Sequence, residues 1–351
     1  MKRAVAVRQL AEADYPAWND LAAKSPEGSI YATPEYLATL CEATGGNFRI
    51  IAAFRGDELV GGVPLYEESG AWGKVVSTRL LLYYCGPVLR GYETKYPSQR
   101  TARQLEILGA LAEALDGLGY ARLRLRARGS LTDVRAFQAR GWRAAPTYSY
   151  VVPIVDLVAQ RERVEQNLRR LIDRCARQGI AYTDDDDFAS FFAVHLQLHE
   201  RKGAPLYLPQ PAFERYFRRL KAAGLCRLLH ARLPDGLSIA SQITLLGRHP
   251  IAHTVTAGAH ADYLNLGASA FLRWKSCETL AALGYQGNDL TDAALNPVTH
   301  FKSQLGGDLH TNFVIERREA TKLVIAERVG GVARRARRLA RAAVRRLIRR
   351  R

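Results

Sequence analysis

The feature that most constrains the fold of this chain is an order of helical and strand-like patterns that occurs twice. In each half, over roughly 150 residues, a pair of helical patterns precedes a series of strands, and another helix and further strands follow. A chain of 351 residues is long enough for two domains, each with its own core. We therefore predict an α/β (α+β) fold of two tandem domains, each a mixed, mostly antiparallel sheet flanked by helices.

The first predicted domain covers residues 1–146. Thr33-Pro34 is typical of a helix start, because a capping residue is followed by proline at the first helical position. Gly56-Asp57 is a hairpin turn signal. In the run 121–126 leucines alternate with arginines, which predicts a strand with an apolar face and an arginine face. The expected helices are 13–24, 34–44, 101–117 and 131–140, and the expected strands are 49–55, 58–66 and 121–126.

The second predicted domain covers residues 147–320 and repeats this plan. Its first long helical pattern ends at Gly179, a residue type that commonly terminates helices. The expected helices are 161–178, 188–201, 210–223 and 268–283, and the expected strands are 150–156, 180–183, 226–232, 237–246, 251–257, 286–290 and 312–316.

The net charge of +17 is concentrated in a basic tail, residues 321–351. The tail holds twelve Lys or Arg and one Glu, a net of +11, which leaves +6 for the other 320 residues. Apolar residues recur there at helical spacing, so we predict a basic amphipathic helix that contacts RNA or an anionic membrane, or else a solvated tail. Its apolar face is rich in alanine and lacks aromatic residues, so a membrane contact would be mainly electrostatic. The arginines expected to make the contact are Arg334, Arg335, Arg338, Arg341 and Arg345.

Two other features bear on location. The longest apolar runs are far shorter than the ~20 residues of a membrane span, and the first eight residues lack the apolar region of a secretory signal. The five cysteines are scattered singly, which favours reduced thiols over disulfides or a zinc site. We therefore expect a cytoplasmic protein. The basic tail also allows peripheral contact with the inner membrane surface.

Several patterns are candidates for chemistry. Lys302 lies near a helix end followed by a glycine pair, where its ammonium could stabilise negative charge on a carbonyl oxygen or phosphate. Arg170, Arg174 and Arg177 share one helix face, which is either a cradle for phosphates or a solvated surface. Gly267-Ala268 stands at a helix start that could bind an anion, and it is similar to half of the pyrophosphate loop of acetyl-CoA-dependent acetyltransferases.

Two further patterns are not interpreted as metal sites. His195 and His199 are four residues apart on a predicted helix, but no glutamate lies between them in the HExxH pattern and no third ligand is evident. The run Asp184–Asp187 is expected to be a solvated loop between a strand and a helix.

Read in order, these segments resemble the Fem-type (FemAB) aminoacyl-transferase superfamily, which consists of two GNAT-like domains. The resemblance covers about residues 15–310. The matching segments are Trp18 with 25–36, Gly61-Gly62-Val63-Pro64-Leu65, Tyr84-Cys85-Gly86-Pro87, 167–179, Arg201-Lys202-Gly203, 284–290 and Phe301-Lys302-Ser303-Gln304-Leu305-Gly306-Gly307.

The resemblance implies attack of an acceptor amine on an activated carbonyl, usually the ester of an aminoacyl-tRNA, without a cofactor or metal. It implies that Lys302 stabilises the oxyanion, so Lys302 is the predicted catalytic residue. The residues expected to bind substrate are Phe301, Tyr31, Tyr36, Arg170, Arg174 and Asp289, with Gly267 and Ala268 as a donor-phosphate site. The partners expected are tRNA and a peptide, peptidoglycan-precursor, amino-sugar or natural-product acceptor.

Two alternatives stay open at this point. One is a double-GNAT N-acyltransferase that uses acyl-CoA or a carrier-protein thioester in exopolysaccharide or lipid synthesis. The other is a non-catalytic pair of GNAT domains that binds RNA or a membrane.

The tail makes a first testable prediction. Truncation after Gly331 should weaken binding to polyanions and flatten its salt dependence, because each phosphate contact by Lys or Arg releases a counterion. The measurement is the slope of log K against log salt for tRNA, and for anionic vesicles, with the full chain and the truncated chain. An unchanged slope would show that the tail makes no contact with the polyanion and is only solvated.

Overall fold

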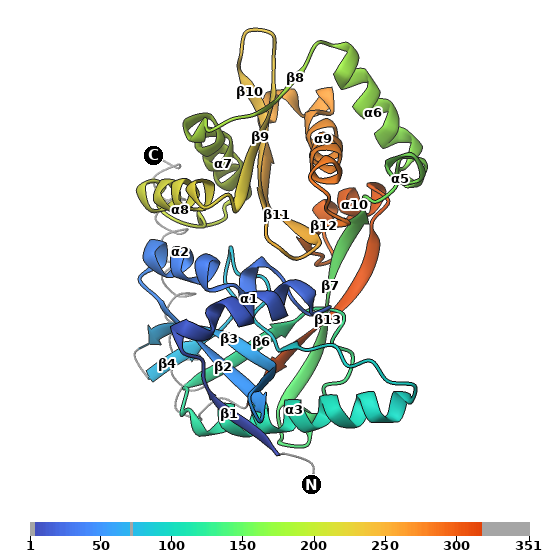
Figure 1. The fold of residues 1–351 in the computed structure, drawn as a ribbon. Helices are drawn as coiled ribbons and strands as arrows, with labels where there is room; N and C mark the ends of the chain where they lie inside the picture. The colour runs from blue at the N-terminus through green and yellow to red at the C-terminus, as the bar shows by residue number, and fades with distance from the viewer. Residues whose placement is uncertain (1–3, 71–72, 318–351) are drawn as a thin grey trace, which may run out of the picture.

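The structure is a computed structural model that describes residues 4–70 and 73–317. Figure 1 shows two halves, one above the other, joined by a pair of long strands. The basic tail predicted over residues 321–351, with Arg334 and the other tail arginines, lies outside the described residues. Among the described helices, none combines the length and the apolar character needed to cross a membrane.

The first half follows the predicted order of elements, with additions. The chain begins with a strand that was not expected, because the run Val5–Gln9 is only five residues long and pairs with β2 alone, at the edge of the sheet. The elements are β1 (Val5–Gln9), η1 (Glu12–Asp14), α1 (Tyr15–Lys24), η2 (Ile30–Ala32), α2 (Pro34–Thr44), β2 (Asn47–Arg55), β3 (Glu58–Gly70), β4 (Gly73–Val76), β5 (Val88–Leu89), α3 (Pro97–Gly117), β6 (Arg122–Ala127) and α4 (Arg135–Gln138).

The second half also follows the predicted order, and its first strand begins before the expected domain boundary. Strand β7 spans Arg143–Pro153, so a boundary after residue 146 falls inside a strand. The elements are β7 (Arg143–Pro153), α5 (Leu157–Arg163), α6 (Gln166–Arg177), β8 (Ala181–Asp184), α7 (Phe188–Lys202), α8 (Gln210–Ala222), β9 (Cys226–Arg232), β10 (Ser238–Leu245), β11 (Ile251–Ala259), η3 (Ala261–Leu266), α9 (Ala268–Ala282), β12 (Gly287–Asp292), α10 (Pro297–Gln304) and β13 (Asp308–Glu316).

One sheet runs through both halves. Within the described residues its order is β1-β2-β3-β4-β6-β13-β7-β12-β11-β10-β9-β8, with β5 paired to β3. Most neighbouring strands are antiparallel, but β4 and β6, and β11 and β12, are parallel pairs. The predicted mixed, mostly antiparallel α/β architecture with flanking helices is therefore confirmed. The two halves share one continuous sheet rather than two separate ones.

Strands β7 and β13 hold the halves together. They pair antiparallel along the full length of β13, from Asp308 opposite Val151 to Glu316 opposite Arg143. The last four residues of β13 also pair with β6, so a strand from the end of the described chain completes the sheet of the first half. The other edge of β7 pairs with β12 of the second half. In Figure 1 this pair runs from the upper half into the lower half.

The helices of the two halves also pack on each other. Helix α2 lies beside α8 (Figure 1), and the Tyr36 hydroxyl is 2.8 Å from that of Tyr216. One hydrophobic core contains buried residues of both halves, including Leu40 from α2 and Phe217 from α8. A shared core and a shared sheet fix the halves relative to each other, because moving one would expose apolar surface and break strand pairing.

Two predicted elements differ in extent. The helix expected over 161–178 is two helices, because Val164 is extended and buried while the Glu165 amide donates to the Gln304 carbonyl at 2.9 Å. The chain thus leaves the helix to bond the end of α10. The helix expected over 131–140 is reduced to the four residues of α4.

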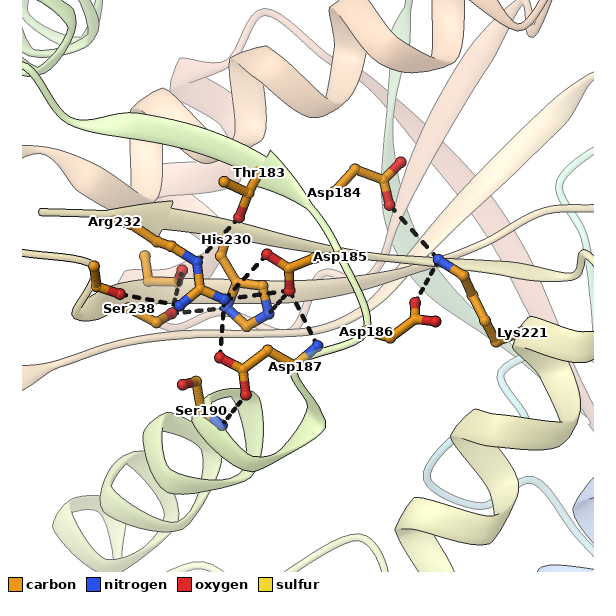
Figure 2. A network of polar contacts seen from close by, with 12 residues as sticks. Thr183, Asp184, Asp185, Asp186, Asp187, Ser190, Lys221, His230, Arg232 and Ser238 are labelled. Atoms are coloured by element: carbon orange, nitrogen blue, oxygen red, sulfur yellow. Dashed lines mark hydrogen bonds and ion pairs between the residues drawn. The ribbon is translucent and has the colours of Figure 1, made fainter. Parts of the chain in front are cut away.

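The run Asp184–Asp187 connects strand β8 to helix α7, as predicted, but its carboxylates are ion-paired rather than free in solvent (Figure 2). The Arg232 guanidinium is 3.1 Å from Asp185 Oδ2 and 2.9 Å from Asp187 Oδ2. Lys221 Nζ on α8 is 2.7 Å from Asp186 Oδ1. These ion pairs join the turn before α7 to strand β9 and helix α8. The sequence did not reveal them because the basic partners are distant in sequence.

Asp187 has a second role, because its Oδ1 caps α7 by accepting a hydrogen bond from the Ser190 amide at 3.0 Å. Burial opposes its ionisation, but the bonds from Ser190 and the Arg232 cation outweigh this and lower the pKa of Asp187 to about 2. Because the folded-state pKa lies below the unfolded value, the charge stabilises the fold above about pH 4 and this stabilisation is lost as the pH falls toward 2.

We therefore predict that Asp187→Ala lowers the free energy of unfolding at pH 7 by about 1–2 kcal/mol, the usual cost of losing a helix cap. Asp187→Asn should cost less, because asparagine also caps helices and only the charge is lost. The measurement is urea unfolding between pH 2.5 and 7. Equal stability of Asp187→Ala and the parent chain at pH 7 would contradict this role.

Candidate active site

Polar residues of both halves meet where strand β12 separates from β11. The parallel ladder joins Ile251–His253 to Gly287–Asp289 and stops there. Strand β11 nevertheless runs to Ala259 and β12 to Asp292, whose partner is Ser149 on β7. The end of β12 is thus bordered by the first-half loop around Tyr84, by α9 and by α10.

Asp289 is held by both halves and is only 1% exposed. Its Oδ2 accepts a hydrogen bond from the Tyr84 hydroxyl at 2.8 Å, and its Oδ1 accepts one from the Thr291 amide at 2.7 Å. Thr291 has φ 61°, a conformation that β-branched residues rarely adopt and that concentrates at functional sites. The predicted residue Asp289 therefore lies at the junction of the halves, where it orients the end of β12.

Close packing of the loop before β5 brings Tyr84 to Asp289. The Cys85 amide donates to the Arg126 carbonyl of β6 at 3.1 Å. A side-chain carbon at Gly86 would lie 2.4 Å from the Ala127 Cα, so only glycine allows this approach. The glycine of the Tyr84-Cys85-Gly86-Pro87 segment is thus explained by the distance between loop and sheet.

Lys302 lies on α10 and is buried, with 8% of its surface exposed. Its Nζ donates a hydrogen bond to the Asp292 carbonyl oxygen at the end of β12. The end of α10 is fixed by Gln160, whose Nε2 donates to the Leu305 carbonyl at 2.8 Å. Gly306 has φ 75°, and a side-chain carbon there would lie 2.8 Å from the Arg163 backbone. The segment after Lys302 therefore fixes the position of its helix.

Four charged groups surround the Lys302 ammonium. Burial, with smaller contributions from the Arg273 and Arg126 guanidinium groups, lowers the pKa of Lys302, while Asp292 and Asp289 raise it, and the net value is about 8. At pH 7 most of the Lys302 population is therefore still charged, in a region with little water. Such a cation stabilises nearby negative charge more strongly than a solvated lysine would.

Tyr31 and Tyr36 are both fully buried. The ring of Tyr31 packs against His253 at 4.9 Å and Tyr84 at 5.9 Å between centroids, so it borders the Asp289 region. The Tyr36 hydroxyl instead contacts the Leu81 carbonyl and Tyr216 and joins the two halves. Of these two predicted substrate contacts, the structure brings only Tyr31 close to Asp289.

The other predicted contacts divide into two groups. Phe301 is half-buried beside Lys302 and packs on the core of the second half. Arg170 and Arg174 are exposed on α6, and Arg174 donates to the Asn265 carbonyl just before α9.

The predicted anion site at the start of α9 is covered. A side-chain carbon at Gly267 would lie 3.1 Å from the Leu171 Cβ of α6, and Ala268 is 1% exposed. Helix α6 thus brings Arg170 and Arg174 to this end of α9, but it also covers the amide groups there. A phosphate could not reach the Ala268 amide without displacement of α6.

His195 and His199 pack together with ring centroids 4.2 Å apart, inside a cluster of aromatic rings. Burial, and to a lesser extent His199, lowers the pKa of His195 to about 4, so its ring is neutral at pH 7. His199 Nδ1 lies 2.7 Å from the Pro205 carbonyl and carries the proton that this bond requires. Within residues 4–70 and 73–317, no three His, Cys, Asp or Glu side chains converge as metal ligands.

Sequence reasoning missed several residues of this site. Arg126 was assigned to the arginine face of its strand by alternation, yet it is 8% exposed, because the Tyr84 ring and the Asp292 carboxylate lie over it, 5.6 Å and 3.5 Å away. His253 and Arg273 gave no signal, since single basic residues in apolar segments are common. The sequence signal that could have located this site is Tyr83-Tyr84, an aromatic pair just before Cys-Gly-Pro.

Comparisons with known proteins agree with this architecture. Residues 160–303 match the family described as an acetyltransferase (GNAT) domain. Compared by sequence with curated proteins, the chain has no significant match. The structure is similar over both halves to solved proteins, and the chain has the Fem-type fold of two tandem GNAT-like domains that was predicted.

Three solved structures illustrate the similarity. FemX has a TM-score of 0.69 and 11% identity, with 88% of this chain and 96% of that chain covered. L-PGS from Bacillus licheniformis has a TM-score of 0.54 and 14% identity, with 84% and 95% covered. A tandem GNAT protein from the clavulanic acid biosynthesis pathway has a TM-score of 0.54 and 14% identity, with 89% and 97% covered.

Proposed function

We propose that this protein is an acyltransferase that forms an amide bond, with Lys302 as its catalytic residue. The observation that carries the proposal is a buried lysine, still charged at neutral pH, held against the end of β12 at the junction of two GNAT-like halves. The acetyltransferase-domain match over residues 160–303 and the likeness to FemX support the same class of reaction.

In the proposed reaction an acceptor amine attacks an activated carbonyl. The new C–N bond forms as the carbonyl π electrons move to oxygen, and the Lys302 ammonium stabilises this oxyanion. One N–H of Lys302 is bonded to the Asp292 carbonyl, so two others remain for the oxyanion. When the intermediate collapses, the C–O bond of the ester breaks, and the proton lost by the amine ends on the leaving hydroxyl.

For the donor we propose an aminoacyl-tRNA. The resemblance to Fem-type transferases supports this choice, as does the net charge of +17, because phosphate backbones attract basic proteins. The start of α9 favours an aminoacyl-tRNA over acyl-CoA as the donor, because helix α6 covers the backbone amides that would bind the pyrophosphate of CoA. The acceptor would be the amino group of a peptide, a peptidoglycan precursor or a natural product, including an amino sugar. We place the reaction in the cytoplasm, with the tail at the inner membrane surface as an option.

An acyl-CoA or carrier-protein thioester is the second candidate for the donor. The observation in its favour is that the matching family is described as an acetyltransferase domain. The third candidate is a pair of domains that binds RNA or a membrane without catalysis. Such binding does not require a buried, charged lysine such as Lys302.

The donor can be tested directly. The full chain is incubated with a mixture of amine acceptors and either charged tRNA or acyl-CoA, and amide products are measured by mass spectrometry. We expect amide formation from charged tRNA that ribonuclease abolishes. Amide formation from acyl-CoA alone would replace the proposed donor, and formation from neither would favour a non-catalytic role.

The role of Lys302 predicts a pH dependence. Because the ammonium is the active form and burial lowers its pKa to about 8, kcat/KM should fall as the pH rises above about 8. Lys302→Ala should lower turnover by a factor on the order of 10² or more with the fold retained, as for loss of an oxyanion donor. Initial rates between pH 6 and 10 are measured, with spontaneous ester hydrolysis subtracted.

Lys302→Arg is the matched control, because arginine stays charged throughout this range and should remove the fall above pH 8. Activity that increases through pH 8 in the parent chain would instead identify a neutral amine acting as a base. Near-normal turnover of Lys302→Ala would exclude Lys302 from the mechanism.

A further inference from the structure

Arg273 is a half-buried cation without a partner among the described residues. It lies on α9, one turn before Cys277, and its Nη1 is inaccessible to solvent although the residue as a whole is only half-buried. It forms no hydrogen bond or ion pair with any described residue. Burial lowers its pKa to about 10, so it is charged at neutral pH.

The other buried arginines of this region differ from Arg273. Arg126 lies 3.5 Å from Asp292 Oδ1 and donates to the Tyr148 carbonyl at 3.3 Å. Arg128 donates to the Gly28 carbonyl and lies 3.3 Å from His249 Nε2. A guanidinium has five N–H donors, and burying any of them unpaired, as at Nη1 of Arg273, is costly. An arginine kept in this state is therefore available for a ligand.

The charges around Lys302 do not balance. The cations that act on one another there are Lys302, Arg273 and Arg126, and the carboxylates are Asp289 and Asp292. These groups include more cations than carboxylates, and Arg128, whose guanidinium lies 5.9 Å from the centre of the Tyr84 ring, adds a further cation nearby. Negative charge supplied by a substrate would therefore be favourable there.

We propose that Arg273 binds a carboxylate carried by one of the two substrates, beside the carbonyl that Lys302 polarises. A carboxylate supplies negative charge, and its two oxygens match the geometry of a guanidinium. Tyr207, whose hydroxyl is close enough to interact with the Arg273 charge, lies on the path between α7 and α8 and would border the same ligand. The role assigned to Lys302 here rests on the proposed function.

Carboxylate binding also couples to the charge of Lys302. Arg273 disfavours the protonated form of Lys302, and a carboxylate on Arg273 would offset that effect. The substrate would thus keep Lys302 in the charged form that stabilises an oxyanion. Binding of the anion and retention of the Lys302 proton should then be linked, and this linkage can be measured without turnover.

The first experiment measures the pKa of Lys302 by NMR of the full chain labelled with [13Cε]lysine, with the Lys302 signal assigned by its loss in Lys302→Arg. The probes are succinate and the uncharged succinamide. We expect succinate to raise the pKa of Lys302 by about half a unit or more, and succinamide to leave it unchanged. In Arg273→Gln the pKa should already be higher without a probe and should not respond to succinate.

Two further variants control for the overall basic charge. Arg215→Gln removes an exposed arginine of α8 and should keep the full response to succinate. Arg273→Lys keeps the positive charge but loses the two parallel N–H groups of the guanidinium, so succinate should raise the pKa of Lys302 by less than in the parent chain. This variant replaces Arg273→Gln if the latter does not fold. No response in the parent chain, or an equal response in Arg273→Gln, would overturn the proposal.

Kinetics then identify which substrate carries the carboxylate. Arg273→Gln should raise the KM of either the charged tRNA or the acceptor about tenfold or more, and the affected substrate is the source. Unchanged KM values for both would overturn the proposal. If charged tRNA gives no amide at all, the proposed donor fails, while the NMR experiment still decides whether Arg273 binds a carboxylate.

Discussion

The antiparallel pairing of β7 with β13 is the interaction on which the rest of the structure depends. Strand β13 comes after every other described element, yet it lies in the middle of the sheet, between β6 and β7. Without it, the first half would end at β6 and the second half would begin at β7. The pairing therefore sets the distance between Tyr84, on a loop of the first half, and Asp289, on a strand of the second.

This arrangement explains why the candidate active site lies between the halves rather than inside one of them. The Tyr84 hydroxyl and Asp289 Oδ2, 2.8 Å apart, are contributed by segments more than two hundred residues apart. A hydrogen bond to a buried carboxylate is expensive to break, because the carboxylate would be left without a donor. The contact therefore transmits the position of one half to the other at the end of β12, next to Lys302.

The fold could be predicted from the sequence because its elements follow local rules. Helix α2 was expected from its Thr33-Pro34 entry, and strand β6 from the alternation of leucines and arginines. What could not be predicted depended on partners distant in sequence. The run Asp184–Asp187 was expected to be a loop and is one, but its ion pairs were not expected, because nothing nearby in the sequence reveals that Arg232 and Lys221 would reach it.

The candidate site divides in the same way. Lys302 and Asp289 were predicted, because they lie in segments that resemble Fem-type transferases. Arg126 and Arg273 were not, because alternation along a strand and position on a helix do not show which faces are covered on both sides. The sheet must be assembled before the charge around Lys302 can be counted, and that count is a property of the tertiary fold alone.

Helix α9 shows how the two parts of the site differ in their means of binding anions. At its start, where a helix would offer backbone amides, Gly267 is packed against Leu171 and Ala268 is buried. Further along the same helix, Arg273 offers a guanidinium without a partner. A side chain can present a full charge inside a covered site, whereas helix amides offer only partial charges at an open end. The proposed anion contact of α9 therefore lies in its interior, on the side of Lys302, and not at its N-terminus.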